Sequence, residues 1–502
     1  MRSRAWIGLV LLAAAVPARA AWHADRFLVG GYCTNGTSAD HAGELQDMND
    51  AGLDFVINFN LAPPASANEL RRVLDALAAR SPDFHLRLIA VSLGGGRASP
   101  TFREDATSWE PLDRPATDWP AITSTLDGLA GPSLLGVELQ DEPRSPDSID
   151  TVRVAVDRIQ STRSELAFVN LLAAGLGRRG ATLWNPSDLA DWQATYRNYV
   201  GRYVAPHGAN AIRPPVVSVD AYPFIFPHPA WGGDRPNVAF FATLKLLREV
   251  ATRENGVPFW YVMQIGRDAA PFYPANPAGL ESAAAGGYCS PIPDQDRVQV
   301  IYALPLTERK LRFQAFAGLA YGAKAIAYFP LTPAFDEFEG GLLYGSGKRT
   351  PAYELIQRLT TEIHHLGRWL LPLTPDRAYH VSLDPVPGSP SHRGAQVGID
   401  GELVFDGFLT ALGSQTPGGA DWAMASRLRD PATGYDYLFL MNKNTGADAF
   451  PIRITATLGR TPSAVFHVSK ASGDLEPMST ASARVESALI APGDAELYQL
   501  RY

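Results

Sequence analysis

The sequence predicts an α/β fold in which a (β/α)8 TIM barrel is followed by a C-terminal antiparallel β-sandwich domain. Strand patterns alternate eight times with helical patterns up to about residue 371. After about residue 372 the pattern changes to short alternating runs. The chain has 502 residues, which is more than one ordinary hydrophobic core accommodates. We therefore predict two domains, at 21–371 and 372–502.

The eight predicted strands are short apolar or alternating runs: 26–33, 55–59, 85–93, 134–142, 166–172, 215–224, 258–266 and 325–331. Helical periodicity follows each of them, at 39–52, 67–80, 119–129, 148–161, 189–203, 238–252, 308–321 and 352–371. A doubly wound open sheet is the alternative, but residues 30–36 lack the glycine spacing of its phosphate-binding loop. The count of eight favours the closed barrel.

The C-terminal region has no convincing long helix. Alternating runs at 402–409, 436–441 and 495–500 are separated by clusters of Gly, Pro, Asp and Asn. This pattern is typical of an antiparallel sandwich, which we expect to pack on the barrel.

Residues 1–20 have the layout of a cleavable secretory signal. Arg2 and Arg4 precede an apolar run, and a small-x-small site follows at 18–20. The run is too short to span a bilayer, and no later run is long enough. We expect a secreted or periplasmic protein without a membrane span, whose oligomeric state the sequence leaves open.

Charge and cysteine content limit the partners. The formal net charge is −8 and becomes −11 without residues 1–20, which contain three arginines and no acid. Such an acidic surface repels phosphate backbones, so nucleic acid is not expected as a partner. Cys33 and Cys289 are the only cysteines. Export allows a disulfide between them, and two buried thiols are the alternative.

The strand at 134–142 runs into two adjacent carboxylates. Strand alternation predicts that Glu138 shares one face with Glu142, and Pro143 should end the strand. Asp141 and Glu142 would then lie at the C-terminal end, where parallel barrels carry their chemistry. Glu138 is expected to be a structural carboxylate within the barrel, because buried charges need partners.

Other strand ends supply polar and aromatic side chains to the same rim. The expected set is Tyr32, Asn58, Asp141, Glu142, Asp220, Tyr222, Gln264 and Phe329, with Trp231 as a further substrate-binding residue. Carboxylates accept hydroxyl donors and aromatic rings pack on apolar sugar faces, so we expect a carbohydrate substrate. We expect no cofactor. His364, His365 and Glu362 lack the spacing of a metal site and are interpreted as a helix surface.

Residues 137–143, VELQDEP, resemble the fourth-strand signature of the large retaining clan of (β/α)8 glycoside hydrolases, in which Asn-Glu-Pro ends the strand. The resemblance covers about residues 26–371 and implies that Glu142 is the acid/base. It places Asp141 where the clan has an Asn that contacts the sugar 2-hydroxyl. Residues 219–223, VDAYP, are similar to the strand of the clan that ends in a Tyr near the nucleophile.

Gln264 departs from the clan, which has a nucleophilic Glu at the end of the seventh strand. A neutral amide has no usable nucleophilic oxygen for this step. Four interpretations remain open: an inverting enzyme with Asp220 as base, a substrate that supplies its own nucleophile, a loop acid such as Asp268 or the cluster at 336–339, and a barrel that binds sugar without cleaving it.

The sequence thus predicts a secreted glycosidase that cleaves a glycosidic bond in a poly- or oligosaccharide. Glu142 would be the general acid/base, with Asp220 and Asp141 as further catalytic candidates. The alternative is a non-catalytic glycan-binding or surface-polysaccharide assembly protein on a decayed glycosidase barrel.

Overall fold

The computed structural model describes most of the chain. The described residues are 22–32, 41–58, 64–91, 126–143, 146–172, 189–208, 211–224, 238–268, 273–274, 297–298, 307–332, 338–344, 346–381, 405–446, 448–478 and 482–502. The predicted signal, Cys33, Cys289 and Trp231 lie outside them.

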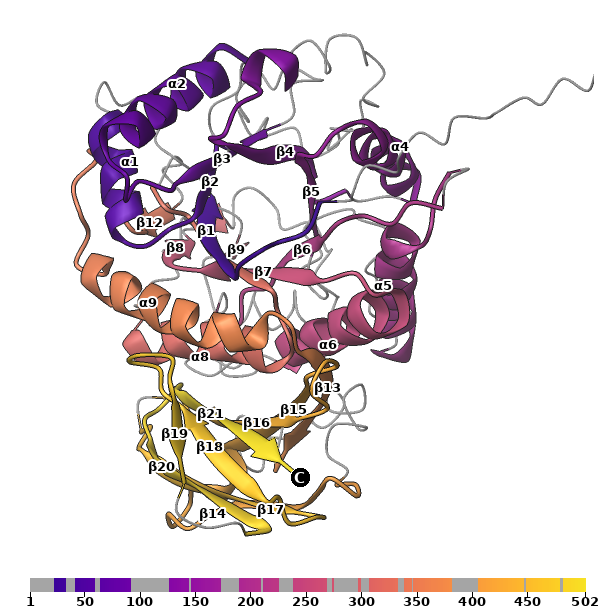
Figure 1. Cartoon of the computed structure of the whole chain (residues 1–502), viewed down its shortest axis with the longest axis vertical. Helices are drawn as coiled ribbons and strands as arrows, with labels where there is room; N and C mark the ends of the chain where they lie inside the picture. The colour runs from indigo at the N-terminus through magenta and orange to yellow at the C-terminus, as the bar shows by residue number, and fades with distance from the viewer. Residues whose placement is uncertain are drawn as a thin grey trace, which may run out of the picture.

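Eight parallel strands close into a barrel in the order β1-β11-β7-β6-β5-β4-β3-β2 (Figure 1). Their bounds are β1 (Leu28–Tyr32), β2 (Phe55–Ile57), β3 (Arg87–Val91), β4 (Leu134–Asp141), β5 (Leu166–Leu171), β6 (Val217–Asp220), β7 (Phe259–Gln264) and β11 (Ala325–Phe329). The parallel pairing of β1 with β11 closes the ring. The predicted (β/α)8 barrel is confirmed, and the open-sheet alternative is wrong.

Helices surround the strands (Figure 1). They are α1 (His41–Asp50), α2 (Pro64–Arg80), α4 (Pro146–Thr162), α5 (Leu189–Val204), α6 (Val238–Leu246), α8 (Glu308–Ala320) and α9 (Tyr353–Leu370). In α9 the buried residues Ile356, Leu359, Ile363 and Leu366 recur every three or four positions, which places one apolar stripe against the barrel. The single α-helix predicted at 238–252 is wrong in its second half, because Leu247–Glu254 is a π-helix.

The barrel interior is filled by large side chains. Trp260 lies 5.3 Å from Phe55 and 5.5 Å from Phe168, measured between ring centroids. Gly30 faces this layer: a Cβ atom there would lie 2.4 Å from the Phe55 carbonyl oxygen and 2.5 Å from its ring. Strand β1 therefore needs glycine at this position so that the Phe55 ring can fill the core.

The C-terminal region forms two antiparallel sheets, of order β13-β15-β16-β21-β18-β19 and β14-β17-β20. The strands are β13 (Thr374–His380), β14 (Leu409–Ser414), β15 (Ala423–Arg429), β16 (Asp436–Asn442), β17 (Ile452–Leu458), β18 (Ala464–Val468), β19 (Leu475–Pro477), β20 (Arg484–Ile490) and β21 (Ala495–Arg501). Of the expected run at 402–409, residues 402–404 lie outside the described residues, 405–408 are not in a strand, and β14 begins at Leu409. The two sheets share a hydrophobic cluster, and we interpret this pair as the predicted sandwich.

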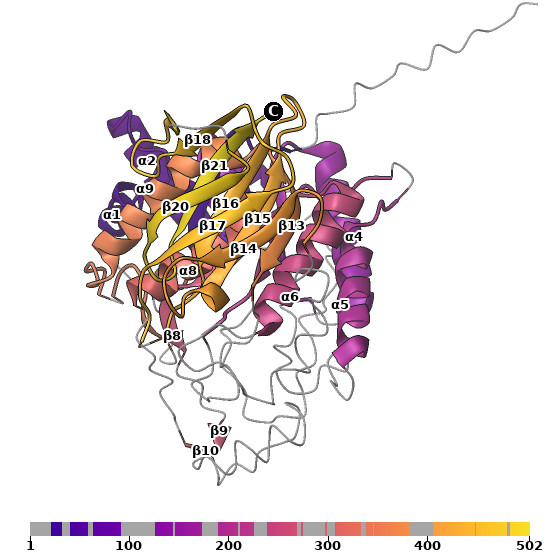
Figure 2. The same cartoon turned by 90° about the horizontal axis from the view of Figure 1, so that it is seen from below.

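The six-stranded sheet packs on the barrel helices (Figure 2). Phe439 of β16 lies 6.3 Å from Phe316 of α8, and both belong to the cluster that continues into the barrel core.

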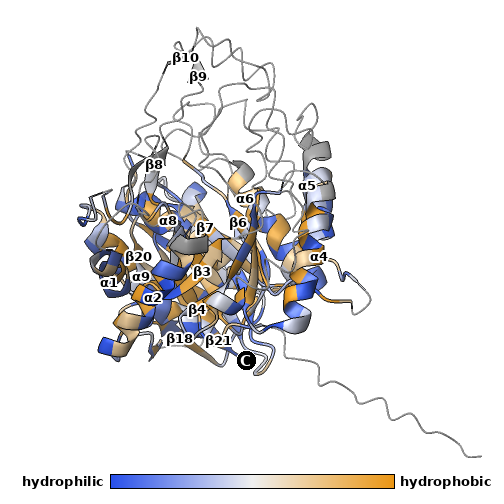
Figure 3. Ribbon diagram, turned by 90° about the horizontal axis from the view of Figure 1, so that it is seen from above, coloured by the Kyte–Doolittle hydropathy of each residue, from blue (hydrophilic) through white to orange (hydrophobic). Residues whose placement is uncertain are grey.

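Short strand pairs lie outside the main sheets: β8 (Gly266–Asp268) with β12 (Phe338–Gly340), and β9 (Tyr273–Pro274) with β10 (Arg297–Val298). In Figure 3 the barrel strands are coloured mostly as hydrophobic residues. Within the described ranges, no helix is long and apolar enough to cross a membrane.

Replacement of Gly30 by alanine should overpack this core. We expect Gly30→Ala to lower the free energy of unfolding by about 1–3 kcal/mol, because the added methyl group would overlap Phe55. Gly128→Ala is the control, since no atom lies within 4 Å of the position that its Cβ would take. Urea denaturation of both variants measures the difference. Equal stabilities would contradict the proposed overlap.

Candidate functional site

Strand β4 carries a β-bulge just before the two carboxylates. Its register with β5 pairs Glu138 with Phe168 but Gln140 with Val169, so one extra residue is inserted between them. Asp141 then pairs with Asn170, which shares the inward face of Phe168. The predicted uninterrupted alternation is therefore wrong beyond Leu139, which still packs on the outer face with Val137: the bulge shifts the phase and turns Asp141 to the inside.

Glu138 lies inside the barrel with 1% of its surface exposed. The Tyr32 hydroxyl donates a hydrogen bond to Glu138 Oε1 at 3.1 Å, which links β1 to β4 across the interior. Burial and the nearby Glu138 carboxylate raise the pKa of Tyr32 well above its usual value, so its hydroxyl keeps its proton. Glu138 thus has the buried polar contact expected of a structural carboxylate.

A chain of side-chain hydrogen bonds holds Asp141. Asn170 Nδ2 donates to Asp141 Oδ1 at 3.0 Å, and Ser218 Oγ donates to Asn170 Oδ1 at 3.0 Å. Strands β4, β5 and β6 are thereby joined by side-chain hydrogen bonds. Neither Asn170 nor Ser218 is among the residues predicted from the sequence. Asn170 follows Phe168 by two residues on a strand, and this spacing was the available signal.

Glu142 comes directly after β4 in an unusual backbone conformation. Its φ angle is +48°, and only one other described non-glycine residue, Ala211, has a positive φ. Hydrogen bonds hold the segment: the Glu142 N–H donates to the Asn170 carbonyl at 2.8 Å, and the Tyr199 hydroxyl donates to the Pro143 carbonyl at 2.7 Å. Such strain persists only where surrounding structure imposes it, and it is typical of functional positions.

Asp220 ends β6 and is hydrogen-bonded to the Glu142 side chain. Asp220 is 7% exposed, whereas Glu142 is half-buried. Burial raises the pKa of Asp220 well above its usual value, and the charges of Glu142 and Asp141 raise it further. Asp220 therefore keeps its proton at a pH where an isolated aspartate has lost it.

Aromatic rings lie at the neighbouring strand ends. Tyr222 stacks on Phe329 with ring centroids 5.8 Å apart and an interplanar angle of 18°. Phe329 also meets Tyr32 edge to face at 6.3 Å. In the barrel order β7 lies between β6 and β11, so the Tyr222–Phe329 stack bridges the strands on either side of β7.

Gln264 occupies the end of β7, as predicted, and pairs with Phe329 in register. It is 7% exposed, and the side chain of Gln314 forms two hydrogen bonds with its backbone. The Gln264 N–H donates to Gln314 Oε1 at 3.0 Å, and Gln314 Nε2 donates back to the Gln264 carbonyl at 3.0 Å. The structure thus puts an amide beside the aromatic stack.

Other predicted residues have different surroundings. Asn58 Oδ1 accepts a hydrogen bond from the Val91 N–H at 2.9 Å and so holds the end of β3. Residues two apart on a strand share a face, and Val56 packs against the helices. This spacing puts Asn58 on the outer face, so its substrate-binding role stays a prediction.

Of the loop acids, Glu339 pairs in register with Arg267 between β12 and β8, and 336–337 lie outside the described residues.

The histidines of α9 are not simply a solvated helix surface. His364 Nε2 contacts the Gly52 carbonyl at 2.9 Å, and His365 Nδ1 contacts the Lys470 carbonyl at 2.7 Å. Both rings are partly buried between neighbouring elements. No group of three potential metal ligands occurs among the residues that the structure describes.

Comparisons with known proteins show similarity at the level of three-dimensional structure. No family model and no curated protein sequence matches the chain. A family 39 glycoside hydrolase from Bacteroides cellulosilyticus WH2 is 10% identical, with 95% of this chain and 81% of that chain covered and a TM-score of 0.43. The GH30 xylanase C from Talaromyces cellulolyticus is 11% identical, with coverages of 96% and 98% and a TM-score of 0.41. A GH42 beta-galactosidase from G. stearothermophilus is 9% identical, with coverages of 95% and 99% and a TM-score of 0.41.

The raised pKa of Asp220 predicts a pH-dependent stability. Folded Asp220 keeps its proton at pH values where the unfolded chain has lost it, so its contribution is complete below about pH 4 and is lost as pH rises through the folded pKa. We expect the stability of the wild type to fall relative to Asp220→Asn across this window. Denaturant unfolding at a series of pH values measures the difference, and parallel pH profiles would contradict it.

Proposed function

We propose that this chain is a glycoside hydrolase in which Glu142 protonates the leaving oxygen of a glycosidic bond. The observation that carries the proposal is the contact between the Glu142 and Asp220 carboxyl groups at the C-terminal end of the barrel. A carboxylic acid that stays protonated near neutral pH is the group such a reaction requires. Glu142 is the more exposed member and therefore the one that meets the substrate.

The contact between the two carboxyl groups bears on the second catalytic component. An inverting pair stands about 6.5–9.5 Å apart, with water between. Asp220 is hydrogen-bonded to Glu142, which is much closer, so this separation disfavours Asp220 as a base across the sugar. Asp220 instead orients the Glu142 carboxyl group through this contact. Of the open interpretations, a nucleophile supplied by the substrate fits this contact better than inversion.

The reaction balances with these groups. Glu142 gives a proton to the leaving oxygen as the bond from the anomeric carbon to that oxygen breaks, and the nucleophilic group of the substrate bonds to the anomeric carbon. Water then breaks this second bond by adding a hydroxyl to the anomeric carbon, and its remaining proton returns to Glu142. Asp141, which is oriented by Asn170, accepts a sugar hydroxyl, and Tyr222 with Phe329 packs on an apolar sugar face.

The remaining organisation is proposed on the sequence patterns. Residues 1–20 would be removed on export, which gives a secreted or periplasmic enzyme. Residues 21–371 would form the catalytic domain, and 372–502 the sandwich that packs on it. The change to antiparallel pairing at β13, which begins at Thr374, supports this boundary.

Replacement of Glu142 by glycine should lower turnover while raising the free energy of unfolding. Glu142→Gly removes the side chain from a positive-φ position, so we expect about 1 kcal/mol of added stability, because glycine adopts this conformation without strain. Turnover should fall by about 10²–10⁴-fold, the usual contribution of a general acid. Release of reducing ends from a glycan panel and urea denaturation measure the two effects.

Ala211→Gly is the matched control, since Ala211 has a φ of +50° outside the site. It should gain stability and keep wild-type turnover. Glu142→Gln should lose turnover while still binding the glycan. An unchanged rate in either Glu142 variant would refute the assignment. Binding without product release by the wild type would instead favour the glycan-binding alternative.

A further inference from the structure

The turn between β20 and β21 approaches the first turn of α8 unusually closely. Gly493 has a φ of +75°, and a Cβ atom there would lie 1.9 Å from the Arg309 carbonyl oxygen and 2.8 Å from its carbonyl carbon. The obstacle is helix backbone, which cannot rotate away as a side chain can. Only glycine allows the C-terminal sheet to meet α8 at this distance.

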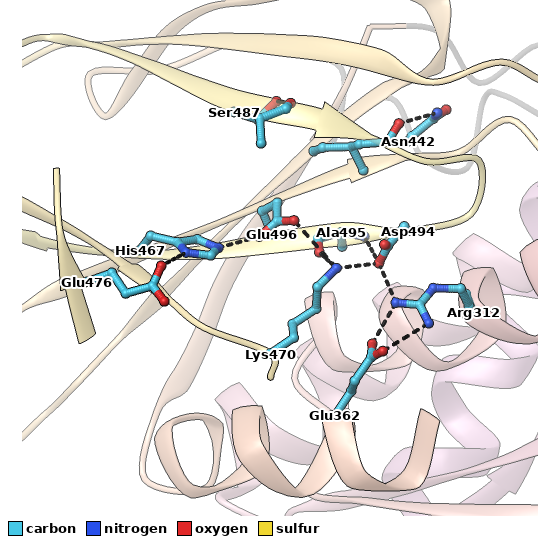
Figure 4. Close-up of polar contacts among 12 residues, drawn as sticks. Arg312, Glu362, Asn442, His467, Lys470, Glu476, Ser487, Asp494, Ala495 and Glu496 are labelled. Atoms are coloured by element: carbon cyan, nitrogen blue, oxygen red, sulfur yellow. Dashed lines mark hydrogen bonds and ion pairs between the residues drawn. The ribbon is translucent and has the colours of Figure 1, made fainter. Parts of the chain in front are cut away.

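Charged groups fasten the same turn to α8 (Figure 4). Asp494 Oδ1 accepts from Arg312 Nη2 at 3.1 Å and from Lys470 Nζ at 2.7 Å. Arg312 also forms a two-point contact with Glu362 of α9, at 3.2 and 2.6 Å. Arg312 is 8% exposed, so these carboxylates compensate a guanidinium that has lost most of its water.

The turn is itself held rigidly by the sheet. The Gly493 N–H donates to the Asn442 carbonyl, and the Asn442 N–H donates to the Asp494 carbonyl, both at 3.0 Å. The Ala495 N–H donates to Asp494 Oδ1 at 2.7 Å. Its conformation therefore depends on β16 as well as on β20 and β21.

Helix α8 carries this contact to the candidate site. Gln314 lies two residues after Arg312, is fully buried, and forms both hydrogen bonds to the backbone of Gln264. Gln264 ends the strand between Asp220 and Phe329. A shift of α8 that follows the turn would therefore move the end of β7.

We propose that the β20–β21 turn positions the end of β7 through α8, with Gln314 as the positioning residue. The C-terminal sheet is then part of the machinery that holds the site in shape. The effect on turnover rests on the proposed glycosidase function, whereas the effect on backbone protection does not.

Hydrogen exchange followed by mass spectrometry tests the backbone effect on the full chain. The reporter is the Gln264 amide, which Gln314 protects. Gly493→Ala and Gln314→Leu should each speed its exchange by about tenfold or more at temperatures where the fold persists. Gly434→Ala is the matched control: Gly434 has a φ of +73° in another turn, and nothing lies within 4 Å of the position that its Cβ would take. It should leave the reporter unchanged.

Turnover supplies the second measurement. Gly493→Ala should lower kcat by about tenfold while KM changes little, because the site is misaligned rather than removed. Asp494→Asn, which keeps the side-chain shape, should act in the same direction and replaces Gly493→Ala if that variant does not fold. Wild-type protection of the Gln264 amide in Gly493→Ala or Asp494→Asn would overturn the proposal. If the wild type has no hydrolytic activity, the proposed glycosidase function is refuted. The hydrogen-exchange result then decides alone whether the β20–β21 turn positions the end of β7.

Discussion

The hydrogen bond between Glu142 and Asp220 is the constraint around which the site is organised. Burial and the charges of Glu142 and Asp141 raise the pKa of Asp220, so a proton on Asp220 stabilises this contact. Several local features of the chain serve this contact. The bulge in β4 turns Asp141 inward. Glu142 then adopts a positive φ directly after the strand. Burial at the end of β6 raises the pKa of Asp220, so that its carboxyl group keeps a proton.

Most of the fold could be predicted because its signals are local. Apolar periodicity located all eight barrel strands and nearly all the helices, since each element buries one face along its length. The bulge in β4 could not be predicted, because alternation assumes that each residue opposes one partner. Asn58 is predicted at the rim because it lies at a strand end; its hydrogen bond with Val91 adds a contact to the neighbouring strand, which the sequence pattern does not reveal.

The site itself could be predicted only in part, because its supporting contacts join distant segments. Asp141, Glu142 and Asp220 were found as acids at strand ends, and the structure brings them together. Their support comes from side chains on other elements, such as Asn170 and Gln314, whose roles depend on tertiary packing. An amide at 264 is also compatible with the crowding. A carboxylate at this position would place a charge on a side chain that is only 7% exposed.

The interface with the C-terminal sheet combines hydrophobic packing, which has little directional preference, with close backbone contacts and ion pairs, which depend on geometry. The packing of Phe316 against Phe439 contributes burial without strong directional preference, so it alone would allow the sheet to slide along α8. The close approach of Gly493 and the ion pairs of Arg312 depend on position and angle, and they restrict the interface to one register. Buried ion pairs contribute little net stability once desolvation is counted. Their retention between the two regions is better explained by geometric specificity, which is what a helix that holds Gln264 in place requires.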